Sequence, residues 1–393
     1  MSALLDVQTA RSRVLAAVRV LSPEDVPLAD CLGRVLAADV RAAGDSPPFT
    51  NSAMDGFAVR SGPAGRTLRI VGESRAGAPA DTAVAEGTAV RISTGAMLPA
   101  GADAVIMVER TVEPGDGTVR VDAPTAPSQN VRGAGEDMRA GTTVLTAGMP
   151  VDAAAIGIAA GAHAAALACA RRPRVAILST GDELVPPGAP LGPGQIHNSN
   201  ALTLAALATT AGADVVARVH VTDTAEATRD AIAAVLQDVD VLVLSGGVSV
   251  GPHDHVKGAL EASGVREDFW RVALRPGKPT WFGTRGDALV FGLPGNPVSA
   301  MVTFLLFVRP ALRALQGADP AARRIAVALL EDVPRTEGRD ELVRVTLADG
   351  GATLTGPQGS HVLTSMRGAD GLARIPAGTG DLVRGTEVEV ELL

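Results

Sequence analysis

Three short apolar runs, each leading directly into a glycine-rich polar loop, constrain the fold of this chain more than any other feature. The runs lie at 174–178, 240–244 and 288–291. Uninterrupted apolar runs of this length are typical of strands buried on both faces of a parallel sheet. Ligands of such sheets bind outside the carboxyl ends of the strands. The loops that follow the three runs are 179–183, 245–254 and 292–296.

Helical and extended patterns alternate around these runs, which predicts right-handed βαβ units. Helical periodicity or composition predicts helices at 6–20, 148–170, 200–211, 225–236 and 297–315. Short alternating runs predict strands at 68–71, 89–92, 104–108, 118–121, 215–221, 325–330, 342–347 and 387–392.

The length of 393 residues predicts two or three domains, or more if they are small. The patterns favour a multidomain α/β plus β protein with a central, parallel, doubly wound α/β domain. The expected parts are an elongated helical N-terminal domain (1–45 with 144–172), a β-rich lobe (46–143), the α/β domain (173–318) and a small C-terminal β-barrel (319–393).

Composition and charge exclude several classes of protein. The only cysteines, Cys31 and Cys169, cannot make a disulfide framework or a four-cysteine zinc site. A net charge of −8 and a pI near 5.3 argue against broad nucleic-acid binding. The first residues lack the apolar core of a signal peptide, and the apolar stretch 153–170 is mostly Ala and Gly with His163 inside it. We expect a cytoplasmic protein with neither a nucleic-acid nor a membrane partner.

Lysine is rare in this chain. Only Lys257 and Lys278 stand among 35 basic residues. Arginine is a planar fork and lysine a compact point charge, so the two do not substitute for each other at a phosphate or oxyanion. The two lysines are therefore candidates for anion contacts, with chance retention of a rare residue as the alternative.

The loop Ser179-Thr180-Gly181-Asp182-Glu183 combines a tight turn with two adjacent carboxylates. Backbone amides and hard oxygen ligands in this pattern suit Mg²⁺ with a phosphate. The alternative is a helix start whose acidic residues match the helix dipole.

The loop 245–251 could cradle a phosphate, but it is neither a Walker A loop nor a G-x-G-x-x-G fingerprint. His253-Asp254-His255 follows it. On a helix, residues two apart point in different directions, and no third ligand is near. We therefore favour Asp254 as a Mg²⁺ or substrate contact over a transition-metal site.

Two proline-braced loops could hold an anion. Residues 275–279 place cations on a stiff loop, and 292–297 place two glycines and two prolines before a helix whose first turn holds Ser299. A plain turn and a plain helix start are the alternatives. In the N-terminal half, the polar turns at 51–58, 94–96 and 135–137 could each be ordinary turns when taken alone.

Taken together and in order, these stretches resemble the molybdopterin molybdenumtransferase family, which includes bacterial MoeA and the E domains of gephyrin and its plant counterpart. The resemblance covers nearly the whole chain. The matching pieces are 47–49, 52–56, 91–96, 101–105, 130–132, 135–137, 179–184, 198–200, 245–251, 276–279 and 292–300.

The resemblance implies the last step of molybdenum cofactor assembly. In this family molybdate and adenylated molybdopterin are substrates, a divalent cation (Mg²⁺) assists cleavage of the phosphoanhydride, and AMP leaves. The resemblance also implies a homodimer, in which the β-rich lobe of one subunit reaches the α/β domain of the other. A molybdopterin adenylyltransferase and recipient molybdoenzymes are possible protein partners.

Motif matches assign roles to residues of this chain. The implied catalytic residues are Asp55, Thr94, Asp137, Asp182, Glu183, Asp223 and Asp254, of which Asp182, Glu183 and Asp254 would hold the metal. Lys278, Pro279, Ser299, Arg339 and Ser360 would form the molybdate pocket. The other residues expected to bind the substrates are Ser179, Thr180, Gly181, Ser245, Gly246, Gly247, Ser249, Lys257, Pro294, Gly295 and Asn296.

Three positions depart from the family pattern. Arg275 stands where Lys is usual, Phe57 where Tyr is common, and Gly251-Pro252-His253 precedes Asp254 where an acidic or small residue is frequent. The first departure puts a direct substrate contact by Arg275 in doubt.

Other readings of the same motifs remain open. A molybdopterin adenylyltransferase resembles only 174–316 and lacks the lobe motifs. A non-catalytic scaffold could keep the fold, although the acidic residues are intact. A competence-damage-like pyridine nucleotide hydrolase shares only the central domain.

Overall fold

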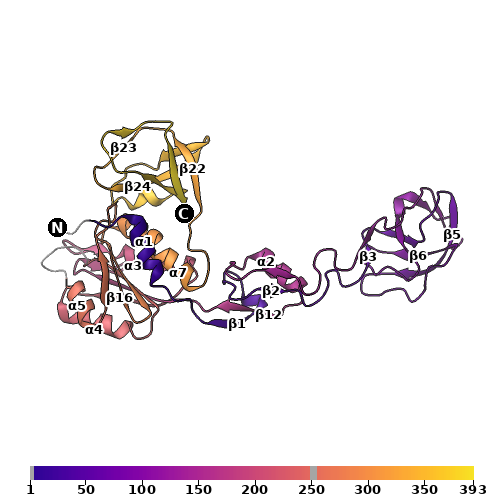
Figure 1. The fold of residues 1–393 in the computed structure, drawn as a ribbon, viewed down its shortest axis with the longest axis horizontal. Helices are drawn as coiled ribbons and strands as arrows, with labels where there is room; N and C mark the ends of the chain where they lie inside the picture. Colours follow the sequence, from indigo (N-terminus) through magenta and orange to yellow (C-terminus); the bar gives the residue numbers. More distant parts are fainter. Residues whose placement is uncertain (1–3, 248–254) are drawn as a thin grey trace. The chain divides into compact units, whose positions relative to one another are not determined.

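The computed structural model describes residues 4–247 and 255–393, which form two compact units (Figure 1). The smaller unit holds residues 25–32 and 38–168. The larger unit holds the residues up to 24, 33–37 and 169–393.

The smaller unit is built on a six-stranded sheet of order β7-β4-β6-β5-β9-β8. The strands are β4 Gly56–Val59, β5 Arg66–Ser74, β6 Thr88–Ile92, β7 Ala104–Met107, β8 Thr111–Val112 and β9 Thr118–Val121. Successive side chains of a strand point to opposite faces. Phe57 and Val59 accordingly join one apolar cluster and Ala58 another, so both faces are covered. The four strands predicted for this lobe are confirmed.

Short elements complete this part of the chain. Two-residue and three-residue strands pair as β2 Val40–Arg41 with β11 Thr143–Leu145, and as β3 Asn51–Ser52 with β10 Val131–Arg132. The helical elements are η1 Leu28–Asp30, η2 Val108–Arg110 and α2 Ala153–Gly161.

The helix predicted over 148–170 is wrong in its second half. Asp152 caps α2 through its side chain, and the helix ends at Gly161, two residues before His163 takes a φ of 66°. The next residues form strand β12 Ala166–Ala170, which pairs with β1 Pro23–Pro27. Alanine-rich sequence has no apolar periodicity, so an available strand partner decides its conformation.

The larger unit contains the predicted α/β sheet, with strand order β16-β13-β17-β21-β20-β18. The first four strands are parallel, and β20 and β18 extend the sheet antiparallel. The strands are β13 Arg174–Thr180, β16 Asp214–Val221, β17 Val241–Ser245, β18 Arg266–Trp270, β20 Trp281–Arg285 and β21 Ala288–Leu293; a small pair, β14 Leu184–Val185 and β15 Ile196–His197, follows β13.

Helices cover both faces of this sheet (Figure 1). Val175 and Ile177 of β13 pack with the helices of one face, and Ala176 and Leu178 with those of the other. The first face carries α1 Val7–Ala16, α3 Ser199–Thr210, α6 Pro297–Thr303 and α7 Arg309–Leu315; the second carries α4 Ala225–Val235 and α5 Val256–Ala262.

The long helix predicted at 297–315 is present, with a π-helical turn, η3 Phe304–Val308, between α6 and α7. Pro310 lies just after this turn and has no N–H to donate, which accounts for a wider turn at this point. Among the described residues this is the one helix long and apolar enough to cross a membrane, and 78% of it is buried inside the protein. It is therefore the core helix of the larger unit.

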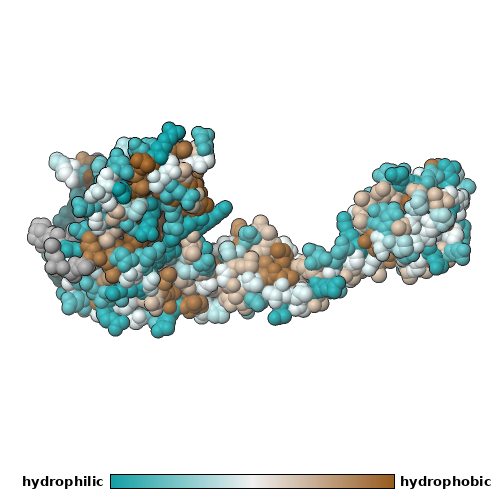
Figure 2. All heavy atoms as spheres, turned by 45° about the horizontal axis from the view of Figure 1, so that its top comes forward, coloured by the Kyte–Doolittle hydropathy of each residue, from teal (hydrophilic) through white to brown (hydrophobic). Residues whose placement is uncertain are grey.

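On the face drawn in Figure 2, hydrophilic and hydrophobic residues are interspersed.

The C-terminal strands close into a five-stranded barrel. The ring runs β24-β25-β22-β28-β26 and closes because β26 also pairs with β24. The strands are β22 Arg324–Leu329, β24 Asp340–Ala348, β25 Gly351–Leu354, β26 Gly371–Ile375 and β28 Glu387–Leu392, with a separate pair β23 Val333–Pro334 and β27 Asp381–Leu382 and a short helix η4 Leu363–Met366. The predicted small barrel is confirmed.

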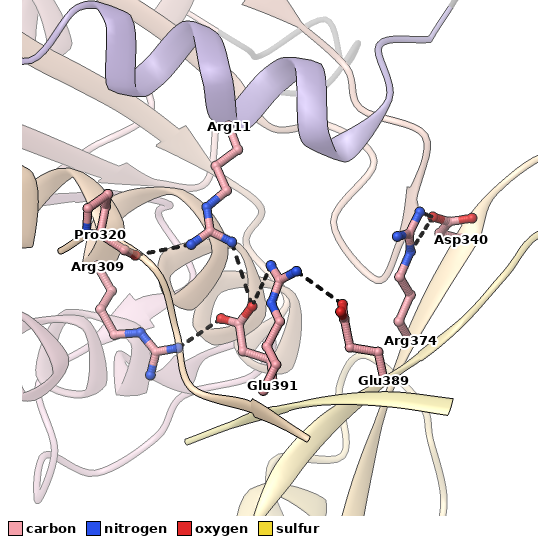
Figure 3. A network of polar contacts seen from close by, with 8 residues as sticks. Arg11, Arg309, Pro320, Asp340, Arg374, Glu389 and Glu391 are labelled. Carbon is pink, nitrogen blue, oxygen red and sulfur yellow. Dashed lines mark hydrogen bonds and ion pairs between the residues drawn. The ribbon is translucent and has the colours of Figure 1, made fainter. Parts of the chain in front are cut away.

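A buried carboxylate joins this barrel to the α/β domain (Figure 3). Glu391 of β28 has only 7% of its side chain exposed and lies 2.9 Å from Arg309 of α7, 3.4 Å from Arg324 of β22 and 3.8 Å from Arg11 of α1. Arg11 also donates to the carbonyl of Pro320 at 3.0 Å. Breaking a buried ion pair by removing one partner costs about 3–5 kcal/mol, so this cluster holds the barrel in a fixed place.

Candidate functional site

The carboxyl ends of three parallel strands meet at one edge of the α/β sheet. Ser179, Ser245 and Leu293 are in register across β13, β17 and β21. The side-chain amide of Asn200 donates to Ser245 Oγ at 2.9 Å and to the carbonyl of Gly295 at 2.7 Å. The loops predicted at 179–183 and 292–296 are therefore neighbours of residues 245–247, the described part of the loop predicted at 245–254.

These loops approach one another so closely that glycine is required. A Cβ on Gly247 would lie 2.4 Å from Val256 Cγ2 and 3.0 Å from Thr180 Oγ1. Gly246 and Gly247 also have φ angles of 91° and 64°, which side chains rarely adopt. Pro294 is buried beneath the same edge. Loops of this kind expose backbone amides that can bind phosphate groups.

Three carboxylates stand at the end of β13 and β16. Asp182 and Glu183 are exposed, and Asp182 Oδ1 accepts a hydrogen bond of 3.1 Å from the backbone N–H of Asp223. A Cβ on Gly181 would lie 2.5 Å from Glu183 Oε2, so the Glu183 carboxylate rests against this glycine. Ser249 and Asp254, also expected here, lie outside the described residues.

The carboxylates fit Mg²⁺ better than a transition metal. Within 4–247 and 255–393, no group of three or more His, Cys, Asp and Glu side chains could hold a metal ion by itself. Mg²⁺ commonly takes one or two carboxylates and completes its shell with water and substrate phosphates. Asp182 and Glu183 supply such oxygens next to the glycine loops.

A cavity of about 350 Å³ lies between the α/β domain and the barrel. The short strand β19 Leu274–Arg275 pairs in parallel with the start of β24, which brings the loop 276–279 against the barrel. The cavity is lined by Leu274, Arg275, Pro276, Gly277, Lys278, Pro279, Ser299, Arg339, Gln358, Gly359, Ser360 and His361. All five residues predicted for the molybdate pocket are among them.

This cavity is suited to an anion. Among the described residues, no Asp or Glu lines it. Lys278 is exposed and Arg339 half-buried, and neither makes an ion pair with any residue in the part of the chain that the structure describes. Ser299 and Ser360 add hydroxyl groups, and Ser360 Oγ accepts a hydrogen bond of 2.9 Å from Asn296.

Arg275, the departure from the family pattern, has a structural partner. Its guanidinium lies 3.5 Å from Glu341 and donates to Thr336 Oγ1 at 2.8 Å. The arginine thus ties β19 to β24, and its charge is compensated by Glu341.

In the smaller unit, two of the predicted residues are in contact. Asp55 Oδ1 accepts from the Thr94 backbone N–H at 2.7 Å and from Thr94 Oγ1 at 3.1 Å. Gly56 follows with no room for a side chain, because a Cβ would lie 1.9 Å from the carbonyl oxygen of Ile106. Asp137 is exposed on this unit, and its side chain makes no hydrogen bond with the described residues.

Lys257, predicted to bind the substrates, is not among the described residues that line the anion cavity. Its Nζ lies 2.6 Å from the centroid of the Trp270 ring, while Arg271 lies 3.9 Å from it. A second cavity, of about 320 Å³, lies beside Ser179 and is lined partly by Asn198, Arg218 and His220. Gln358 and His361 line the anion cavity but were missed by sequence reasoning, which singled out only Ser360 from the segment Gln358-Gly359-Ser360.

Comparisons with known proteins cover nearly the whole chain. Residues 5–162 match the model "MoeA N-terminal region (domain I and II)", 176–314 match "Probable molybdopterin binding domain", and 326–393 match "MoeA C-terminal region (domain IV)".

Individual proteins that are similar to this chain have names consistent with these three family matches. The chain is 38% identical to Molybdopterin molybdenumtransferase 2 of Mycobacterium tuberculosis H37Rv, over 98% of either protein. It is 39% identical to Molybdopterin molybdenumtransferase of Haemophilus influenzae, over 80% of this chain and 78% of the relative. A crystal structure of a molybdopterin biosynthesis MoeA protein from Pyrococcus horikoshii OT3 matches with a TM-score of 0.85 and 28% identity, covering 99% of this chain and 100% of that one.

Proposed function

Because this chain belongs to the MoeA family of molybdopterin molybdenumtransferases, we propose that it inserts molybdate into adenylated molybdopterin with the help of Mg²⁺ and releases AMP. It is a transferase that acts in the final step of molybdenum cofactor biosynthesis.

The observation that carries this proposal is the anion cavity between the α/β domain and the barrel. Molybdate is a small oxyanion with two negative charges. Its site needs cations that are not neutralised by a carboxylate, and hydroxyl groups that can donate hydrogen bonds to it. Lys278 and Arg339 supply the charges, and Ser299 and Ser360 the hydroxyls. Lysine binds as a compact point donor and arginine as a fork, so the two cations would also orient the anion.

The pterin nucleotide would lie along the glycine loops at the carboxyl edge of the sheet. The N–H groups of Gly181 and Gly246 already donate to the Val221 and Leu293 carbonyls, so the Gly247 amide would hold its phosphates. Asp182 and Glu183 would hold Mg²⁺ beside them. When bound, Mg²⁺ offsets the charge that develops on the phosphates during cleavage of the anhydride. The residues of this chain would keep both substrates in a fixed orientation, which lowers the entropic part of the barrier.

The smaller unit would complete the site of a second subunit. Asp55, Thr94 and Asp137 would reach the α/β domain of the partner in a homodimer, and the Asp55–Thr94 contact would fix the Asp55 carboxylate for that task. We further propose that the enzyme is cytoplasmic and works with an adenylyltransferase and recipient molybdoenzymes, with no nucleic-acid or membrane partner.

An adenylyltransferase is less well supported, because the family matches extend to 5–162 and 326–393, beyond the α/β domain that those proteins resemble. AMP release from adenylated molybdopterin, measured with Mg²⁺ and with or without molybdate, tests the proposal. Release that molybdate stimulates supports it. A pterin nucleotide that binds but is never cleaved would instead identify a scaffold.

A further inference from the structure

One buried cation lies next to the anion cavity without lining it. Arg344 sits in the middle of β24 and has 1% of its surface exposed. Its strand neighbours Val343 and Val345 point into the barrel core, whereas Leu342, on the same face of the strand as Arg344, packs in the core of the α/β domain. Arg344 is thus on the outside of the barrel, on the side that meets the α/β domain.

The side chain of Arg344 is bonded to the segment that forms one wall of the cavity. Its Nη2 donates to the carbonyls of Pro357 and Gly359, both at 3.3 Å, and its Nε donates to Ser365 Oγ at 3.1 Å. Pro357 and Gly359 flank Gln358, and Ser360 follows directly, so the guanidinium holds the backbone on which two cavity-lining side chains stand.

The backbone of Arg344 holds the same segment. Its N–H donates to Gln358 Oε1 at 2.8 Å, and its carbonyl accepts from Gln358 Nε2 at 3.2 Å and from the Thr355 N–H at 3.0 Å. A single residue of β24 therefore organises the chain from 355 to 359.

Arg344 has no carboxylate partner within ion-pair distance in the described parts of the chain. The nearest acidic influence is Glu341, which is already engaged by Arg275 and Thr336. Burial lowers the pKa of Arg344 from its ordinary value, although arginine remains charged in proteins. A buried charge that binds only neutral oxygens is a costly way to stabilise a barrel, which favours a role in the neighbouring cavity.

We propose that Arg344 is a positioning residue of the molybdate pocket, holding the segment 357–360 so that Ser360 and Gln358 face Lys278 and Arg339. This inference rests on the proposed function of the cavity. Loss of the Arg344 guanidinium should weaken molybdate binding. Binding of the pterin nucleotide, which would contact the loops at 179–183 and 245–247, should be largely unaffected.

The test compares Arg344→Gln and Arg344→Lys with wild type in the full-length enzyme. Molybdate alone is titrated calorimetrically, and KM is measured for molybdate and for adenylated molybdopterin. We expect Arg344→Gln to weaken molybdate binding roughly tenfold, as for the loss of hydrogen bonds from a charged group, with the pterin KM changed less than about twofold. Arg344→Lys keeps the charge, but lysine cannot reach two carbonyls and a hydroxyl at once. Its molybdate affinity should therefore lie between those of wild type and Arg344→Gln.

Arg335→Gln is the matched control. Arg335 belongs to the same barrel and its guanidinium also donates to two backbone carbonyls, those of Thr379 and Gly380, but it neither lines the anion cavity nor belongs to the Glu391 cluster. It should leave the molybdate affinity unchanged. If Arg344→Gln does not fold, Ser365→Ala removes the acceptor of Nε, together with the hydrogen bond of 2.6 Å that Ser365 Oγ donates to the Val362 carbonyl. It should weaken molybdate binding in the same direction, by less.

A double-mutant cycle with Ser360→Ala separates positioning from a general effect. If Arg344 acts through this segment, Arg344→Gln should cost less molybdate affinity in the Ser360→Ala background than in wild type. Additive losses, equal losses for both substrates, or unchanged molybdate affinity would overturn the inference. If Lys278→Ala and Ser360→Ala also leave molybdate binding unchanged, the proposed function of the cavity fails as well.

Discussion

The side-chain amide of Asn296 donates a hydrogen bond of 2.9 Å to Ser360 Oγ, joining two loops that are 64 residues apart in the chain. A second bond, from the Val298 N–H to the Ser360 carbonyl at 3.1 Å, fixes the same contact. The loop that follows β21 and the barrel loop are thereby held together at the edge of the anion cavity.

Replacing Asn296 by Ala should release the hydroxyl of Ser360. The Val298 bond remains, so the enzyme should stay folded, and molybdate affinity should fall roughly threefold to tenfold, the usual range for one neutral hydrogen bond. Calorimetric titration with molybdate measures this. Affinity equal to that of wild type would mean that Ser360 needs no orientation from Asn296.

Lys278 should not be replaceable by Arg. Lys278→Arg keeps the charge, but a fork cannot take the place of a point donor beside the stiff, proline-braced loop. We expect a higher KM for molybdate in Lys278→Arg and a further rise in Lys278→Ala, with unchanged thermal stability because Lys278 is exposed. If the KM for molybdate is the same in wild type, Lys278→Arg and Lys278→Ala, then Lys278 does not contact the anion and its retention as a rare lysine is due to chance.

The carboxylates at the end of β13 should set the demand for Mg²⁺. Asp182→Asn and Glu183→Gln preserve size but remove a hard anionic ligand, so AMP release should need a higher Mg²⁺ concentration and fall at least about tenfold at a fixed one. Measuring AMP release across a Mg²⁺ titration checks this. An unaltered Mg²⁺ curve in either variant would remove that residue from the metal site.

Mixed dimers test the proposal that two subunits share one site. Asp55→Ala affects the smaller unit and Glu183→Ala the larger one, so each homodimer should be inactive. Co-expressed subunits should form some dimers with one intact site and recover up to about half of the wild-type activity per mixed dimer. Two different purification tags isolate the mixed species. Its inactivity would place both residues in the site of a single subunit.

A bidentate ion pair at the start of β17 should make stability depend on acidic pH. Both Asp240 oxygens accept from Arg171 at 2.7 Å, and the Arg174 N–H also donates to Oδ2 at 2.7 Å. Burial raises the pKa of Asp240, but these hydrogen bonds outweigh it and hold the pKa below the ordinary value of 3.8.

A depressed carboxylate pKa stabilises the fold above the unfolded-state value and loses that contribution as pH falls through the folded value. Asp240→Asn should therefore lower the free energy of unfolding by about 2 kcal/mol at neutral pH. The difference in the free energy of unfolding between Asp240→Asn and wild type should shrink as the pH falls below 3.8. Urea unfolding at several pH values measures this, and a gap independent of pH would contradict the assignment.

Much of the fold could be predicted because its signals are local. Buried runs such as 174–178 and the apolar helix at 297–315 identify the α/β domain without knowledge of their partners. The segment 166–170 could not be predicted, because an alanine-rich run becomes a strand only through pairing with β1. The division into four domains stays a prediction.

The site was predictable only where a motif carried it. Lys278, Ser299 and Ser360 come from separate motifs, and the structure brings them to one cavity through the pairing of β19 with β24. Gln358 and Arg344 carry no signal of their own, because their roles depend on hydrogen bonds to a barrel loop. The sequence singled out Arg275 as a departure from the family pattern, but its ion pair could not be predicted because Glu341 lies far along the chain.

The central claim is that the cavity between the α/β domain and the barrel binds molybdate. The most direct measurement is anomalous X-ray scattering at the molybdenum edge from crystals of the protein soaked in molybdate. The account predicts a peak inside this cavity, placed so that the molybdate oxygens lie within hydrogen-bond distance of Lys278, Ser299, Arg339 or Ser360, and its loss in Lys278→Ala crystals. Molybdenum bound only elsewhere, or a peak that persists in the variant with other ligands, would contradict it.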